Sequence, residues 1–155
     1  MQPRVDYRKA APAGAFEAMW GLEHYTRNCG LERPLLELVK MRASQINGCA
    51  FCIDMHSKDA RAAGETEQRL YALNAWRETP FFTERERAAL AWTETLTLIS
   101  THGVPDDLYA RMAQHFSEAE IVNLSLAVVA INGWNRLAIS FRSVPGSYQP
   151  AATPK

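Results

Sequence analysis

The stretch from Glu37 to His56 reads ELVKMRASQINGCAFCIDMH. It divides at Asn47-Gly48, a dipeptide that favours left-handed backbone and therefore interrupts a helix. Residues on both sides of this dipeptide have helical periodicity. The stretch predicts two helices that meet in a turn directly before Cys49.

The second of these helices carries Cys49, Cys52 and His56. Spacings of three and four residues place all three side chains on one helix face. A helix that begins at Gly48 or Cys49 has Cys49 in its first turn, where unpaired N–H groups and the helix dipole stabilise a thiolate. Two thiols that can form a disulfide, with an imidazole in reach of one, indicate a redox site.

The two cysteines are not equivalent as nucleophiles. The helix dipole favours Cys49 and is worth ~0.3–1 kcal/mol when exposed. A neighbouring imidazole that acts as base is worth ~10²–10⁴ in rate, and His56 is four residues from Cys52 but seven from Cys49. The larger effect predicts that Cys52 is the attacking thiol and that Cys49 is the resolving thiol, which then forms a disulfide with Cys52.

With Glu37 upstream, these offsets resemble the active-site signature of the AhpD-like alkylhydroperoxidases, small all-helical proteins of the carboxymuconolactone decarboxylase superfamily. The later segments FTERERAALAWTE and INGWNRLAISF resemble the C-terminal half of that family. The CxxC motif is typical of the peroxidase-like branch rather than of the decarboxylase branch.

The resemblance implies a cysteine-based peroxidase that reduces hydroperoxides through a dithiol/disulfide cycle. Cys52, Cys49, His56 and Glu37 would be its catalytic residues: Cys52 the attacking thiol, Cys49 the resolving thiol, His56 the general base, and Glu37 the group that orients or relays protons. It also implies no cofactor and no metal, an external dithiol reductant of lipoyl or thioredoxin-like type, and a homotrimer or homohexamer.

Other interpretations of the same residues stay open. The CxxC could belong to a disulfide oxidoreductase or to a non-catalytic redox sensor. Cys49, Cys52 and His56, with Glu37, could instead bind zinc, although ligands crowded into two turns of one helix converge poorly on a tetrahedral ion. Glu37 could simply pair with Lys40 on an exposed helix face.

Length and composition fit a single domain of 155 residues and 17.4 kDa. Basic and acidic residues both number 17, so the net charge is zero and nucleic acid is not an expected partner. The N-terminus lacks the apolar segment of a secretory signal, and no apolar run reaches the ~18 residues of a membrane helix. Three cysteines, two of them in a CxxC, fit a reducing compartment, so we expect a cytoplasmic protein without a membrane partner.

Helix start and stop signals predict an all-α bundle of about six to seven helices in one domain, 1–155. An N-terminal arm is expected over about 1–12 and a flexible tail over about 143–155. Capping boxes at Thr83 and Ser117 each open a helix. The expected helices span about 13–29, 34–46, 48–64, 66–76, 83–100, 105–116 and 117–141.

The last expected helix is apolar on more than one face, which predicts burial all round and a partner subunit. Several further residues carry no assigned chemistry. Cys29 is expected to be structural, and the tryptophans to lie in the core or an interface; the full set without an assigned role is Cys29, His24, His102, His115, Trp20, Trp76, Trp92, Trp134, Asn135 and Arg136.

Overall fold

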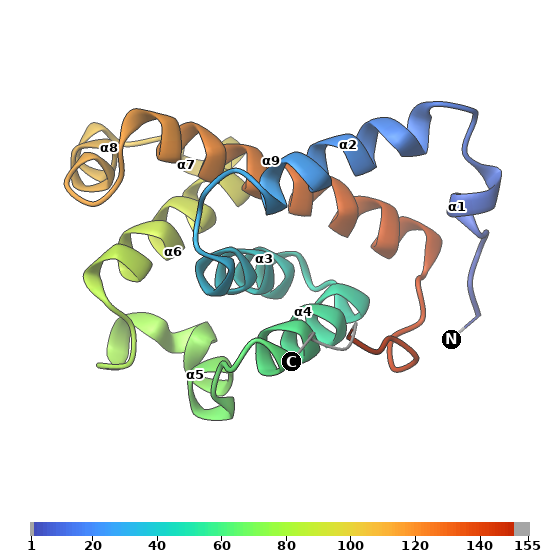
Figure 1. Ribbon diagram of the computed structural model, residues 1–155, viewed down its shortest axis with the longest axis horizontal. Coiled ribbons are helices and arrows are strands. Elements are labelled where there is room, and N and C mark those ends of the chain that lie inside the picture. The colour runs from blue at the N-terminus through green and yellow to red at the C-terminus, as the bar shows by residue number, and fades with distance from the viewer. Residues whose placement is uncertain (1, 151–155) are drawn as a thin grey trace.

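The computed structural model describes residues 2–150, with His102 described by its backbone alone. All the secondary structure in these residues is helical, as predicted (Figure 1). The elements are α1 (Tyr7–Ala10), α2 (Ala15–Arg27), α3 (Arg33–Asn47), α4 (Ala50–Ala62), α5 (Glu67–Ala72), the 3-10 helix η1 (Leu73–Glu78), α6 (Glu84–Thr97), α7 (Ile99–His102), α8 (Asp106–Ala113) and α9 (Glu118–Phe141).

The main helices begin where their sequence signals predict. Thr83 and Ser117 both form complete capping boxes. In each, the hydroxyl of the cap residue accepts a hydrogen bond from the backbone N–H of a glutamate three residues on, and the glutamate carboxylate accepts from the backbone N–H of the cap residue. A proline in the first turn of α3 supplies the fixed φ that a helix start tolerates. The long helices therefore follow from local sequence.

Short segments differ from the prediction. The arm contains the one-turn helix α1, and α2 ends at Arg27 rather than Cys29. The helix expected over 66–76 changes to 3-10 geometry at Leu73, and the helix expected over 83–100 divides at Leu98, which has φ −108°. One-turn segments carry too few residues for an apolar period to show, so the expected six to seven helices were too few.

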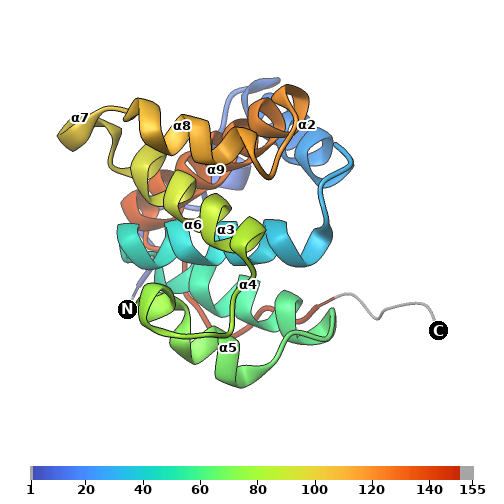
Figure 2. The ribbon, with the colours of Figure 1, turned by 90° about the vertical axis from the view of Figure 1, so that its left-hand side faces the viewer.

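The helix α3 lies at the centre of the bundle, in contact with α4, α6 and α9 (Figures 1 and 2). Its residues Leu38, Val39 and Ala43 are fully buried. α2 packs on α9, and α8 covers one end of the pair α6 and α9. The arrangement holds α4, which carries the CxxC motif, against one side of the central helix.

The helix α9 buries one face, formed by Ile121, Leu124, Val128 and Ile131. Among the described residues, α9 is the one helix long and apolar enough to cross a membrane. Its buried face, however, packs against α2, α3 and α6, as that of a central bundle helix does. Val122, Val129 and Ile139, in contrast, are 58%, 57% and 45% exposed. The prediction that α9 is buried all round does not hold within one chain.

The C-terminal segment after α9 is attached to α4. The N–H of Gly146 donates to Asp54 Oδ2 at 3.0 Å, and Lys58 Nζ donates to the carbonyl of Tyr148 at 3.1 Å. Composition predicts a flexible tail over about 143–155, but it does not reveal these polar partners of 146–148 on another helix. Residues 151–155 lie outside the described range.

Two charged side chains are buried where α2 meets α3. Glu23 and Lys40 are 4% and 1% exposed, and Lys40 Nζ donates to Glu23 Oε1 at 2.7 Å. Arg27 Nε donates to the same oxygen at 2.7 Å. Burial raises the pKa of Glu23, but attraction to Lys40 and the bonds from Lys40 and Arg27 outweigh it and lower the pKa to about 2. The pair thus stabilises the fold through the charged carboxylate.

We predict that Glu23→Gln lowers the free energy of unfolding at neutral pH by about 3–5 kcal/mol, because Lys40 is left buried without its anion. The wild-type pKa is depressed on folding, so this contribution is complete above about 4.5 and is lost as the pH falls toward about 2. Urea unfolding at both ends of this range measures it.

The matched control is Glu67→Gln, which removes an exposed partner of Arg61 at 3.5 Å. That change should alter stability by less than about 1 kcal/mol. Equal effects of the two variants at neutral pH would show that the buried pair does not stabilise the fold.

Candidate active site

The turn between α3 and α4 is built around Gly48, which has φ +69°. Its N–H donates to the carbonyl of Gln45 at 3.2 Å, and the N–H of Cys49 donates to the carbonyl of Ser44 at 2.9 Å. Glycine adopts this left-handed backbone without steric cost. Cys49 becomes the N-cap of α4, one position before the first turn in which the sequence placed it.

A network of amides fixes this turn to α9. Asn47 Nδ2 donates to Asn135 Oδ1 at 2.8 Å and to Asn132 Oδ1 at 3.0 Å. Asn135, fully buried, donates to Ser44 Oγ at 3.1 Å. Asn135 therefore has a structural role that its sequence position did not disclose, while Arg136 is exposed and donates to Asn132 on its own helix.

Cys49 and Cys52 form a disulfide, with their Cα atoms 5.4 Å apart. Both are buried, at 1% and 2% exposure. Cys52, but not Cys49, is among the residues lining a cavity of about 60 Å³, and His56 lies in the wall of the same cavity. The spacing argument that paired Cys52 with His56 agrees with this placement.

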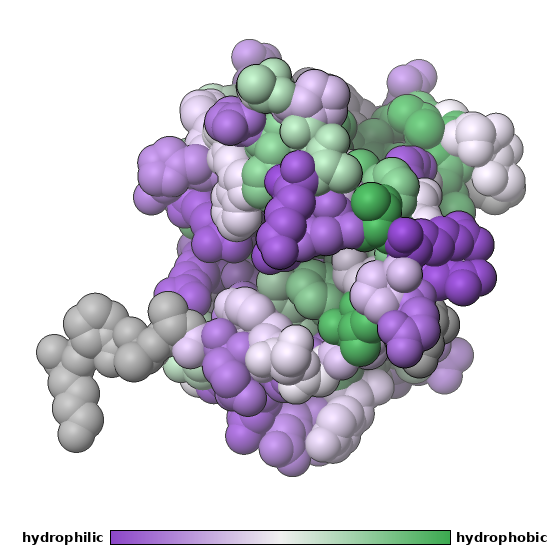
Figure 3. Space-filling view, turned by 90° about the vertical axis from the view of Figure 1, so that its right-hand side faces the viewer, coloured by the Kyte–Doolittle hydropathy of each residue, from purple (hydrophilic) through white to green (hydrophobic). Residues whose placement is uncertain are grey.

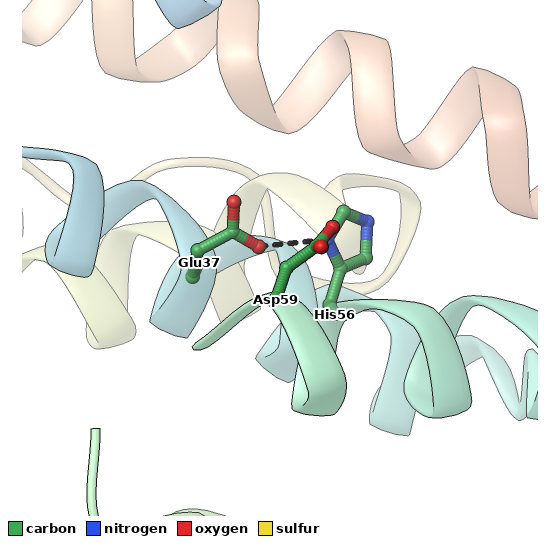
Figure 4. Close-up of side chains that lie close together, drawn as sticks. All are labelled: Glu37, His56 and Asp59. Atoms are coloured by element: carbon green, nitrogen blue, oxygen red, sulfur yellow. Dashed lines mark hydrogen bonds and ion pairs between the residues drawn. The ribbon is translucent and has the colours of Figure 1, made fainter. Parts of the chain in front are cut away.

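His56 is joined to Glu37 across the contact between α3 and α4. The distance from His56 Nδ1 to Glu37 Oε2 is 2.8 Å, and the residues are 2% and 8% exposed (Figure 4). Burial raises the pKa of Glu37, but the hydrogen bond from His56 and the positive charges of His56, Lys40 and Arg27 outweigh it, so that the pKa is lowered. An ionised Glu37 that accepts a hydrogen bond from Nδ1 fixes the orientation of the His56 ring.

The exposed Glu37–Lys40 pair, considered from the sequence, is not what forms. Lys40 turns to Glu23, and Glu37 turns to His56. Both carboxylates lie on the inner faces of their helices, so the pairing depends on how α2, α3 and α4 pack rather than on spacing within α3. The structure thus brings together Glu37, Cys49, Cys52 and His56.

Two residues at this cluster were missed by the sequence analysis. Asp59 lies one turn beyond His56 on α4, and Tyr148 donates its hydroxyl to Asp59 Oδ1 at 2.7 Å. The spacing of Asp59 from His56 was a usable signal, because three residues along a helix share a face. The approach of Tyr148 depends on the path of the C-terminal segment and had no signal.

One nitrogen or oxygen atom from each of Glu37, His56 and Asp59 lies within 4.8 Å of the others, close enough to hold a cation. In this arrangement His56 Nδ1 is bonded to Glu37, and Asp59 accepts from Tyr148. The cation charges of Arg27 and Lys40 also act on Glu37. These contacts satisfy the three groups by hydrogen bonding.

An aromatic wall closes the other side of the Cys52 cavity. Trp20 and Trp134 have ring centroids 5.5 Å apart, and Phe16 lies 5.6 Å from Trp134. Tyr7 of α1 also lines the cavity. Figure 3 shows the face with α1 and the end of α9, where apolar residues lie between polar side chains. Two tryptophans thus face the site, while Trp76 and Trp92 lie in the core as expected.

The other residues without assigned chemistry lie apart from this cluster. The Cys29 thiol donates to the carbonyl of Thr26 at 3.1 Å, which fits the structural role expected for it. His24 lies on α2 and is exposed, and His115 follows α8 and is partly buried. Neither residue lines the Cys52 cavity.

Comparison with known proteins identifies close relatives of the whole chain. An uncharacterised protein of Bacillus subtilis, YdfG, is 49% identical over 140 residues, which cover 90% of this chain and 95% of that protein. A crystal structure from Agrobacterium tumefaciens, of a protein of unknown function considered a candidate antioxidant defence protein AhpD, superposes with a TM-score of 0.91. It is 46% identical, and the match covers 95% of this chain and 100% of that one.

More distant structures share the fold. An uncharacterised peroxidase-related protein from Ralstonia eutropha, described as an alkylhydroperoxidase AhpD core, has a TM-score of 0.79 at 18% identity, over 94% of this chain and 77% of its own. The model of the carboxymuconolactone decarboxylase family matches residues 12–95, which is more than half of the chain. Together with the CxxC turn and the all-helical bundle, these matches show that the chain belongs to the carboxymuconolactone decarboxylase family and is AhpD-like.

Proposed function

We propose that this protein is a thiol-dependent peroxidase that reduces hydroperoxides with Cys52 and Cys49. The observation that supports this best is the buried Glu37–His56 hydrogen bond, at 2.8 Å, beside a cavity that His56 shares with Cys52. Core packing alone does not require an imidazole to be held in one orientation beside a cysteine pair. A histidine that acts as general base for a thiol does require such a fixed orientation.

In the first step His56 takes the proton of the Cys52 thiol, and the thiolate attacks one oxygen of the hydroperoxide. The O–O bond breaks, Cys52 becomes a sulfenic acid, and the departing oxygen takes the proton from His56 to leave as an alcohol. Glu37 holds the ring through Nδ1 and stabilises its positive form between the two transfers.

In the second step the Cys49 thiol attacks the sulfenic sulfur of Cys52, and the hydroxyl leaves as water. The S–S bond that forms is the one in the structure. An external dithiol, of lipoyl or thioredoxin-like type, then reduces it by thiol–disulfide exchange. One turnover consumes a hydroperoxide and two thiols, and yields an alcohol, water and a disulfide.

The placement of the two sulfurs supports Cys52 as the attacking thiol. Cys52 lines the cavity that a peroxide would enter, and Cys49 sits at the N-cap below it. The aromatic wall of Trp20, Trp134 and Tyr7 gives that cavity an apolar side. A disulfide oxidoreductase would use the same pair without needing such a cavity beside one sulfur.

We predict that Cys49→Ser, treated with one equivalent of an organic hydroperoxide, forms a sulfenic acid at Cys52 that dimedone traps, and does not turn over. Cys52→Ser should not react at a comparable rate, because Cys49 has no imidazole base. Mass spectrometry of the trapped adduct reads out both variants. A dimedone adduct on Cys49 in Cys52→Ser, with Cys49→Ser inert, would reverse the two roles.

The exposed apolar residues of α9 support a further proposal, that the chain works as a homotrimer or homohexamer. Val122, Val129 and Ile139 are each at least 45% exposed in the single chain, and all belong to one long helix. Burying them would recover the apolar contact that each now lacks.

Light scattering at micromolar concentration should therefore return three or six times the 17.4 kDa chain mass. Val129→Lys should shift the protein toward smaller species, because a charge would be buried at the contact. A wild-type mass equal to one chain contradicts the proposal.

A further inference from the structure

A second carboxylate lies beside the Glu37–His56 pair. Asp59 is 8% exposed, and one of its oxygens lies within 4.8 Å of both a Glu37 oxygen and a His56 ring nitrogen (Figure 4). Among the described residues, Asp59 forms no ion pair with lysine or arginine. Its side chain accepts a hydrogen bond from the Tyr148 hydroxyl, at 2.7 Å. Two carboxylates thus face a single imidazole.

The position of Tyr148 is fixed by hydrogen bonds between the C-terminal segment and α4. Lys58 donates to the carbonyl of Tyr148 at 3.1 Å, and the N–H of Gly146 donates to Asp54 at 3.0 Å. Gly146 has φ +104°, so the turn that directs Tyr148 back toward α4 requires a glycine. Desolvation, the hydrogen bond to Asp59 and its charge raise the pKa of Tyr148 to about 12, so its hydroxyl remains a donor to Asp59.

The two carboxylates and the thiol face different cavities. Cys52 and His56 line the cavity of about 60 Å³ beneath the aromatic wall. Glu37, Asp59 and Tyr148 line a second, polar cavity of about 280 Å³, and Arg27 lines both cavities. Because Asp59 does not line the thiol cavity, it can act on His56 without touching a substrate there.

Charged groups from every neighbouring element act on this cluster. They are Arg8 of α1, Glu23 and Arg27 of α2, Arg33, Glu37 and Lys40 of α3, Asp59 of α4, and Tyr148 of the C-terminal segment. Arg27 and Lys40 both contact Glu23, and the charge of Arg27 also acts on Glu37 and Asp59. The oxygens of Glu37 and Asp59 lie within 4.8 Å of a His56 ring nitrogen, so two carboxylates act on the ring at short range.

Resting on the proposed function, we propose that Asp59, held by Tyr148, is a positioning residue that stabilises the positively charged form of His56 and thereby the thiolate of Cys52. When His56 takes the thiol proton, it becomes positive as Cys52 becomes negative. Asp59 is three residues from His56 but seven from Cys52 along α4, which is a rise of ~4.5 Å against ~10.5 Å. Its charge therefore stabilises the imidazolium more than it repels the thiolate.

The test measures how fast Cys52 is alkylated, which requires no peroxide. In a Cys29→Ser, Cys49→Ser background Cys52 is the single cysteine of the chain. The rate of its reaction with iodoacetamide, followed from mildly acid to alkaline pH, reports the thiolate fraction. Asp59→Asn and Tyr148→Phe are compared with the background protein, and Asp59→Glu, which keeps the charge, serves as the conservative variant.

Asp59→Asn should lower the alkylation rate at neutral pH by about tenfold. The rate at the alkaline end, where the thiolate forms without the imidazole, should change little. Tyr148→Phe should shift the profile the same way by a smaller factor, and Asp59→Glu should recover part of the loss. Tyr71→Phe, which removes a hydroxyl bonded to Glu67 at 3.3 Å on α5, should leave the profile unchanged.

The proposal fails if Asp59→Asn and Tyr148→Phe both have the profile of the background protein. It also fails if their rates fall by one factor at all pH values, since lost access or packing has that effect. Because alkylation involves no peroxide, absence of peroxidase turnover would leave this result standing, and the two ideas can fail separately.

Discussion

The hydrogen bond between Glu37 and His56 depends on two helices meeting at a fixed angle and register. The left-handed turn at Gly48 sets that meeting, because α3 ends at Asn47 and α4 starts at Ala50. Asn47 and Asn135 tie the turn to α9, so that the position of the CxxC is supported from the far side of the bundle. Every feature of the site, from the disulfide to the cavity at Cys52, follows from this junction.

The charged groups around the site are divided between two clusters, one around Glu23 and one formed by Glu37 and His56. On α2 and α3, one carboxylate oxygen of Glu23 accepts hydrogen bonds from both Lys40 and Arg27. That leaves Glu37 to His56 alone, with its carboxylate ionised because the bond from the ring and nearby cations outweigh its burial. Buried ion pairs seldom add net stability over apolar packing, so such an arrangement is better explained by the orientation it gives to one imidazole.

The sequence was sufficient for the helices and for the cluster of Cys49, Cys52 and His56, because these depend on caps, breakers and spacing along one chain segment. It placed Glu37 in the site only through the resemblance to the AhpD-like family, since the spacing within the helix equally allowed an ion pair between Glu37 and Lys40. Asn135 and Tyr148 could not be placed, because their partners lie 88–91 residues away in the chain. Asp59, in contrast, shares a helix face with His56, so its spacing carried a signal. One-turn helices such as α1 were missed for a simpler reason, the absence of any apolar period in four residues.

The central claim is that an ionised Glu37 enables His56 to activate Cys52. Stopped-flow measurement of Cys52 oxidation by an organic hydroperoxide, in Cys49→Ser and in Cys49→Ser with Glu37→Gln, tests it most directly. Glutamine keeps the shape and an oxygen acceptor but loses the charge, so oxidation should slow by at least about tenfold at neutral pH and by no more than the ~10²–10⁴ that a positioned base supplies. Equal rates in the two proteins, with the helical circular dichroism of both unchanged, would contradict the account.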